Sequence, residues 1–238
     1  MNNSSIFAEK CLAVKKSLLE EESFLKDFPK KNGLNCGLKN LNKNETKNFI
    51  NFVEKNKVFK ERFGLSRVEE DSFWQQIICY LVIVNEDKFF VYQRKIEDPK
   101  YPEKRLEGKI SVGIGGHINP GDTLMGSLYR ELQEELVITL NSKELKDVIT
   151  SNNSISNYLN IKPVALIKDD TNDVGKVHLG LVCIVEPKEM NIEFNIRKNF
   201  EIIFGKFMDM EEYKKLIEKQ GFVAESWTEI VINQYLSK

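Results

Sequence analysis

The sequence has few of the residues from which metal centres and disulfide frameworks are usually built. It contains two histidines and four cysteines in 238 residues. No two cysteines are close enough in sequence to form a C-x-x-C motif. A structural zinc site and a disulfide framework are therefore not expected.

Long apolar runs and an excess of one charge are also missing. The longest apolar run, 77–84, is far shorter than the ~20 residues that span a bilayer. The first ten residues have no apolar signal-peptide core, and the net charge is −1. We therefore expect a cytoplasmic protein without a nucleic-acid or membrane partner. The sequence leaves the oligomeric state open.

The composition changes near residue 75. Residues 1–75 are rich in Lys, Glu and Asn, and we expect them to form an N-terminal extension that packs on a main domain of residues 76–238. Within the extension, Cys11 to Val14 is predicted as a short strand. A helix is predicted from Asn44 to Asn56, with Asn44 as its N-cap. The Gly- and Asn-containing stretch 30–43 is predicted as a loop.

The main domain alternates strand-like and helix-like segments without a strict βαβ rhythm. This favours an α/β (α+β) fold with a mixed sheet and helices packed on its faces. Capping-box spacings at Asp209 with Glu212, and at Ser226 with Glu229, predict the starts of two C-terminal helices. A loop is predicted over 94–109 and a helix over 123–136. Strands are predicted at 77–84, 88–93, 110–118, 161–167, 177–185 and 202–208.

One stretch carries a pattern with chemical meaning. Glu131, Glu134 and Glu135 are spaced i, i+3 and i+4, so they share one face of the expected helix. Like charges so close repel each other, and Mg²⁺ relieves the repulsion because it prefers carboxylate oxygens, water and substrate phosphate. Arg130 can hold a carboxylate through its planar guanidinium, and Gly116 allows a backbone turn close to a ligand. An acidic helix face taken alone is more often a solvated surface.

The combined pattern over residues 116–138 resembles the Nudix box. That box runs Gly, five residues, Glu, seven residues, Arg-Glu, an aliphatic residue, any residue, Glu-Glu, any residue, Gly and an aliphatic residue. Asp122 stands where the family has Glu, which keeps the charge but shortens the side chain. Val137 stands where the family has Gly, so the turn after the helix can differ. The matching residues are Gly116, Arg130, Glu131, Leu132, Glu134, Glu135 and Ile138.

The resemblance extends beyond the box, from about residue 66 to the C-terminus, to a bacterial Nudix subgroup known mainly as predicted phosphoesterases. It implies a mixed sheet sandwiched between helices. It also implies hydrolysis of a small-molecule substrate, a nucleoside diphosphate linked to another group, with Mg²⁺ or Mn²⁺. The segments that carry it include Gln76-Ile77-Ile78, Arg105-Leu106, 111–117, Val177-His178-Leu179-Gly180 and Glu225-Ser226-Trp227.

The expected mechanism is metal-assisted attack of water on phosphorus. Glu131, Glu134 and Glu135 are the expected metal ligands, and one of them can also accept the proton of the water. The family resemblance adds the backbone carbonyl of Gly116 as a ligand. Arg130 is expected to fix the geometry of the carboxylates.

Four further residues are weaker candidates for the substrate site. Arg94 can hold a substrate phosphate or form a surface ion pair. His178 can face the cleft or serve as a hydrogen-bonded structural histidine. Glu201 and Asp173 are alternatives for a further carboxylate from a later part of the chain, with a solvated surface acid as the competing interpretation.

Two other functions remain open from the sequence. A ligand-sensing module that kept the fold but lost catalysis is supported by the departures at Asp122 and Val137, although the intact acidic core argues against it. An isomerase of the Nudix fold acting on isopentenyl diphosphate needs a catalytic cysteine in the cleft. The nearest candidate, Cys79, lies in a predicted buried strand.

Overall fold

The computed structural model describes residues 9–63, 67–95, 104–146, 152–197 and 202–237. A 3₁₀ turn spans Lys104–Leu106, and a π-helical turn at Ile232–Leu236 follows the last helix. The helices are α1 Lys16–Glu21, α2 Lys43–Asn56, α3 Leu124–Glu135, α4 Asn152–Ile155, α5 Asp173–Val177, α6 Met210–Ile217 and α7 Ser226–Val231. The strands are β1 Lys10–Lys15, β2 Lys30–Lys31, β3 Leu34–Asn40, β4 Val58–Glu61, β5 Trp74–Asn85, β6 Lys88–Arg94, β7 Ile110–Ser111, β8 Gly113–Ile114, β9 Leu136–Leu140, β10 Lys143–Glu144, β11 Leu159–Asp169, β12 His178–Pro187, β13 Ile192–Ile196 and β14 Ile202–Met208.

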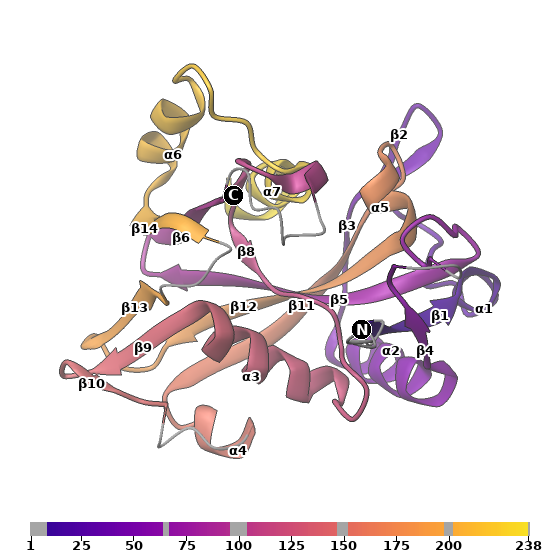
Figure 1. Cartoon of the computed structure of the whole chain (residues 1–238), viewed down its shortest axis with the longest axis horizontal. Coiled ribbons are helices and arrows are strands. Elements are labelled where there is room, and N and C mark those ends of the chain that lie inside the picture. The colour runs from indigo at the N-terminus through magenta and orange to yellow at the C-terminus, as the bar shows by residue number, and fades with distance from the viewer. Residues whose placement is uncertain (1–8, 64–66, 96–103, 147–151, 198–201, 238) are drawn as a thin grey trace, which may run out of the picture.

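A large mixed sheet forms the centre of the molecule (Figure 1). Its main strand order is β14-β6-β5-β12-β11-β3-β2. The two central strands, β5 and β12, run parallel, with His178 opposite Gln76 and Val185 opposite Ile83. The other pairings are antiparallel, and β10, β9 and β13 form a separate three-stranded sheet. The start of β12 therefore lies beside the start of β5, at one end of the central strand pair.

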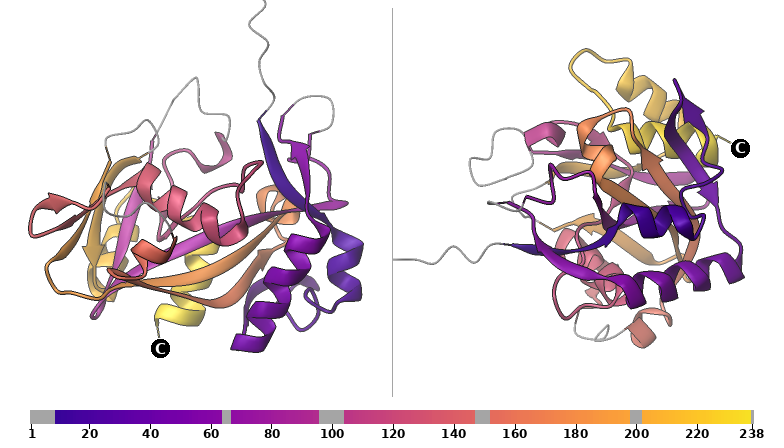
Figure 2. Two further views of the ribbon diagram at one scale, coloured as in Figure 1. Left: turned by 90° about the horizontal axis from the view of Figure 1, so that it is seen from below. Right: turned by 90° about the vertical axis from the view of Figure 1, so that its right-hand side faces the viewer.

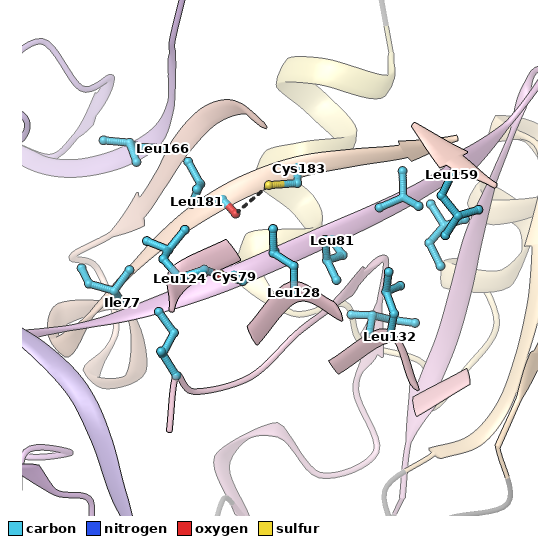
Figure 3. Packing of buried hydrophobic residues seen from close by; sticks show 14 of the residues in the cluster. Ile77, Cys79, Leu81, Leu124, Leu128, Leu132, Leu159, Leu166, Leu181 and Cys183 are labelled. Carbon is cyan, nitrogen blue, oxygen red and sulfur yellow. Dashed lines mark hydrogen bonds between the residues drawn. The ribbon is translucent and has the colours of Figure 1, made fainter. Parts of the chain in front are cut away.

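Strand β5 is buried on both faces, which explains its continuous apolar sequence. Because successive side chains of a strand point to opposite faces, Cys79 and Leu81 pack into one core cluster, and Tyr80 and Val82 pack into another. The first cluster receives the apolar side of α3, as Figure 3 shows. The second receives side chains of α6 and α7. The sheet is thus sandwiched between helices, and the predicted fold class is confirmed.

The N-terminal segment shares the sheet and the core with the rest of the chain. Strand β1 pairs with β5, and β3 pairs with β11. Helices α1 and α2 lie side by side at one end of the molecule (Figure 2), and Phe49 and Val53 of α2 are fully buried in the cluster that holds α3. A division of the chain at residue 75 stays a prediction.

Three local expectations for the chain before α3 were wrong. The predicted loop 30–43 contains β2 and β3, because the backbone of β3 pairs with β11. The N-cap of α2 is Asn42 rather than Asn44, and its side chain accepts from the backbone N–H of Glu45. The expected strand 110–118 is divided into β7 and β8, followed by an isolated bridge at His117.

The two capping boxes near the C-terminus have different outcomes. The box of Asp209 with Glu212 is present at the start of α6, as predicted. The box at Ser226 is absent, because Glu225 is the residue before α7 and its side chain makes no cap. That carboxylate instead accepts from Arg94 and Ser111. Within the described parts of the chain, no helix has the length and apolar character needed to cross a bilayer.

We predict that Phe49→Ala lowers the free energy of unfolding by about 3–5 kcal/mol, because it removes a fully buried aromatic ring. Asn51→Ala, an exposed position on the same helix, is the matched control and should change stability by less than about 0.5 kcal/mol. Denaturant unfolding measures both. A single shifted transition is expected; a separate transition for the N-terminal segment would contradict one cooperative unit.

Candidate functional site

A cleft of about 750 Å³ opens beside α3. Its walls include the acidic end of α3, the segment 113–119, the junction of α5 and β12, and the start of α7. Glu131, Glu134 and Glu135 all line it, as the sequence predicted for a functional helix face.

The glycines before α3 lie in close contact with their neighbours. A Cβ at Gly115 would be 1.7 Å from the carbonyl oxygen of Cys79 in β5, so a side chain there would push the two backbones apart. A Cβ at Gly116 would be 2.6 Å from Oε1 of Glu131. The backbone of Gly116 therefore lies directly against the carboxylate of Glu131, and only glycine permits that contact.

Helix α3 holds its glutamates at different depths. The side chain of Thr123 caps the helix by accepting from the backbone N–H of Gly126 at 2.9 Å. Leu128 and Leu132 are buried in the core, so the opposite side of the helix faces the cleft. Glu131 is 6% exposed, whereas the side chain of Glu134 is 56% exposed. One carboxylate is therefore fixed in the wall and another reaches into solvent.

Arg130 links the acidic residues to the glycine segment. Its Nε donates to Asp122 at 2.9 Å, and its Nη1 lies 2.8 Å from both Glu131 and Glu134. Its Nη2 donates to the backbone carbonyl of His117 at 2.7 Å. Burial alone would lower the pKa of Arg130, but the surrounding carboxylates raise it above its ordinary value. This guanidinium holds three carboxylates that would otherwise repel each other.

The two departures from the box have clear structural consequences. Asp122 is long enough to pair with Arg130 despite its shorter side chain. Helix α3 ends at Glu135 and continues directly into β9, with extended backbone angles at Leu136. Neither Leu136 nor Val137 has a positive backbone φ angle. Val137 therefore fits the extended strand without strain.

The weaker candidates lie in different surroundings. Arg94 lines the cleft and forms an ion pair with Glu225, whose second oxygen accepts from Ser111 at 3.1 Å. Asp173 also lines the cleft, with its side chain 84% exposed and paired with Lys176. Glu201 lies outside the described residues. The substrate-binding roles of these residues stay predictions.

His178 meets His117 and Glu69, and the sequence did not single out these three residues as a group. Its Nε2 lies 3.3 Å from Nε2 of His117 and 4.0 Å from the carboxylate of Glu69. Glu69 is 5% exposed and pairs with Arg62 and Arg105. Burial raises the pKa of Glu69, but His178 and the arginines lower it below its ordinary value. Burial and the nearby Arg62 hold the pKa of His117 well below its ordinary value.

Cys79 is not part of the cleft lining. It is fully buried, and its Sγ lies 3.4 Å from the carbonyl oxygen of Leu124 and 3.3 Å from Oγ of Ser127. Burial raises the pKa of this thiol to about 12. A protonated thiol without access to substrate is a poor nucleophile or acid catalyst.

The donor set beside α3 fits a hard divalent cation. It consists of carboxylate oxygens on one helix face and the backbone of Gly116. Because Gly116 has no side chain, its backbone can lie against Glu131. Oxygen donors of this kind are the ligands that Mg²⁺ and Mn²⁺ prefer. Of these donors, Glu131 is the one that burial and Arg130 hold most firmly in place.

The chain is similar to proteins of known sequence and structure. Over 172 residues it is 32% identical to protein YmaB of Bacillus subtilis (strain 168), covering 69% of this chain and 73% of YmaB. The crystal structure of Tm1382, a candidate Nudix hydrolase, matches with 25% identity and a TM-score of 0.63 over 96% of this chain and 99% of Tm1382.

A more distant structure is a hydrolase of the Nudix family from Clostridium perfringens, with 18% identity and a TM-score of 0.40 over 68% of this chain and 97% of that protein. No family model matches the chain.

We predict that Arg130→Lys lowers the free energy of unfolding by about 1–3 kcal/mol, because an ammonium group cannot reproduce the planar contacts with three carboxylates. Arg67→Lys is the control, since that arginine forms an exposed pair with Glu70 and the exchange should change stability by less than about 0.5 kcal/mol. Denaturant unfolding in chelator measures both. Equal stabilities of Arg130→Lys and the unmodified chain would contradict the role of Arg130.

Proposed function

The chain belongs to the Nudix hydrolase family, and from this premise we propose that it is a metal-dependent hydrolase that cleaves a phosphoanhydride bond. The substrate class is a nucleoside diphosphate linked to another group, bound as a small molecule in the cleft beside α3. The observation that carries the proposal is the buried carboxylate of Glu131 against the Gly116 backbone, in a cleft that Glu134 and Glu135 also line.

The proposed ligands of the metal are Glu131, Glu134, Glu135 and the backbone carbonyl oxygen of Gly116. Bound by these oxygens, Mg²⁺ or Mn²⁺ supplies positive charge that stabilises the phosphate oxygens of the substrate and makes an attacking water more acidic. Arg130 keeps the carboxylates of Glu131 and Glu134 on one side of the helix, because a single Nη1 contacts both.

The two carboxylates held by Arg130 have different proposed roles. Glu131 is buried and held between Gly116 and Arg130, so its proposed role is to position the metal. Glu134 is largely exposed to the cleft and can accept the proton of an attacking water. Catalysis of phosphoanhydride cleavage needs this kind of positioning and charge stabilisation more than covalent chemistry.

Cationic side chains also line the cleft, which supports an anionic substrate. Arg62, Arg94 and Arg105 contribute to the lining. Arginine is suited to phosphate because its planar guanidinium can donate two parallel hydrogen bonds. Of the residues predicted from the sequence, Arg94 is the proposed contact to a substrate phosphate. Asp173 is the proposed further carboxylate of the site.

The two alternative functions receive less support. Asp122 was one of the features that favoured a silent sensing module, but it keeps its ion pair with Arg130. The isomerase alternative needs a cysteine in the cleft, and Cys79 is fully buried in the core. Both observations favour a hydrolase.

Activity should require a divalent metal. We expect Mg²⁺ or Mn²⁺ to support turnover in a screen of nucleoside diphosphate-sugars, dinucleoside polyphosphates, nucleoside triphosphates and NADH. Excess chelator should abolish it, and added metal should restore it, because the acidic cleft needs a cation to accept phosphate oxygens. Release of phosphate or nucleotide is the measurement. Full turnover in chelator would refute the proposal, and no turnover with metal would favour the sensing module.

Glu134→Gln should cut turnover by roughly a hundredfold or more at saturating Mg²⁺, because it removes a charge from the proposed metal site while keeping the size of the side chain. Stability in chelator should change by less than about 0.5 kcal/mol. The control is Glu144→Gln, which alters a carboxylate paired with Arg197 away from the cleft. The control should retain full turnover. Unchanged rates in Glu134→Gln, and likewise in Glu131→Gln and Glu135→Gln, would remove α3 as the metal site.

A further inference from the structure

The only two histidines of the sequence, separated by 61 positions, meet at the cleft. His117 follows the glycine segment and forms an isolated bridge with Ile78 of β5. His178 is the first residue of β12. Glu69, from the turn between β4 and β5, completes the group. One nitrogen or oxygen of each residue lies within 4.8 Å of the others.

We propose that Glu69, His117 and His178 form a second metal site, for a divalent transition-metal ion of the Zn²⁺ class. The Nε2 atoms of the two histidines are 3.3 Å apart. Two Zn–N bonds of about 2.0–2.1 Å at a tetrahedral angle place their nitrogens about 3.3–3.4 Å apart. The carboxylate of Glu69 lies 3.7 Å from His117 and 4.0 Å from His178, so it needs only a small approach to become the third ligand.

The ring of His178 is held in the tautomer that a metal requires. Its Nδ1 lies 2.6 Å from the backbone carbonyl of Val174, and only a protonated Nδ1 can donate there. In the neutral ring, Nε2 then carries the lone pair that faces the site. Metal-binding histidines almost always have such a partner on the other nitrogen.

Lys168 and Arg130 hold the backbone carbonyls of the two histidines. The amine of Lys168, which is fully buried, donates to the carbonyl oxygens of Gly175 and His178 at 2.6 and 3.1 Å. It therefore fixes the junction of α5 and β12. On the other side, Arg130 donates to the carbonyl of His117. Preorganised ligands of this kind reduce the ordering cost of binding a metal.

The arginines around Glu69 orient its carboxylate and still permit a metal. Arg62 contacts Oε1 at 3.1 Å and Arg105 contacts Oε2 at 2.9 Å. Each carboxylate oxygen has two lone pairs, so one hydrogen bond to each leaves a second lone pair for a metal. Arg62 also pairs with Glu9. The two arginines and two glutamates sum to zero charge, so they do not repel a cation as a net positive group would.

Nitrogen ligands distinguish this site from the oxygen ligands beside α3. Imidazole suits Zn²⁺ and related transition metals, whereas Mg²⁺ prefers oxygen. The site uses no cysteine, so it differs from the structural zinc centre that the cysteine spacing argued against. His117 and His178 both line the cleft. Three protein ligands leave a coordination position open toward it, as in catalytic rather than structural zinc sites.

The competing explanation is a direct hydrogen bond between the two rings, with Nε2–H of His117 donating to Nε2 of His178. Zinc titration separates the two. The metal-stripped chain is titrated with ZnCl₂ by calorimetry in excess Mg²⁺, so that the oxygen site beside α3 is already occupied. The ring ¹⁵N signals of the two histidines are followed by NMR in the same titration. We expect one Zn²⁺ per chain and a shift of both sets of signals.

Two variants test the ligands, and two others serve as matched controls. His178→Gln and His117→Asn should each weaken zinc binding at least about tenfold. Glu131→Gln and Glu134→Gln alter the neighbouring carboxylates and should leave it unchanged. Circular dichroism checks that each variant is folded.

The proposal is overturned if zinc does not bind in excess Mg²⁺, if both histidine variants bind normally, or if binding is lost in the glutamate variants instead. If one histidine variant fails to fold, the other variant and the ring signals of the unmodified chain still show whether the histidines bind zinc. The measurement is of binding, so it is independent of whether the chain hydrolyses a phosphoanhydride.

Discussion

The close contact between Gly115 and the backbone of β5 determines the geometry of the cleft. The missing side chain lets the segment 113–117 lie against Cys79 and its neighbours. That placement brings Gly116 against Glu131 and carries His117 to His178. Any larger residue at Gly115 would separate the segment from β5 and displace the backbone in both groups of candidate ligands.

Charge compensation is the second requirement of this arrangement. Partly buried carboxylates are costly unless they are paired. Arg130 meets that requirement for Asp122, Glu131 and Glu134. Arg62 and Arg105 meet it for Glu69. Arg130 holds Glu131 and Glu134 in the cleft wall, and Arg62 and Arg105 each contact one oxygen of Glu69. The same contacts that stabilise the fold therefore orient the candidate ligands.

The cleft also depends on contributions from distant parts of the chain. Glu9 and Arg62 of the N-terminal segment line the cleft, and Glu69 forms an ion pair with Arg62. The pairing of β1 with β4 and β5 joins this segment to the sheet. The C-terminal helix α7 begins at the opposite end of the sequence and contributes Trp227, whose ring packs edge-on against Tyr80. Association of these termini with the central sheet is therefore part of forming the site.

The sequence by itself determined the features that depend on local order. The helical spacing of Glu131, Glu134 and Glu135 placed these glutamates on one face of α3. The apolar run of β5 indicated a buried strand, and the capping box at Asp209 marked the start of α6. The spacing of the box likewise predicted the family and the cleft-lining glutamates.

Only the tertiary structure decided which distant residues meet. Strand β3 lies in a segment with a loop-like composition, and its pairing with β11 overrides that local signal. The meeting of Glu69, His117 and His178 joins three segments that are far apart in the sequence. Periodicity and spacing describe neighbours along the chain, whereas sheet pairing and burial select partners across it, so such contacts leave no local pattern in the sequence.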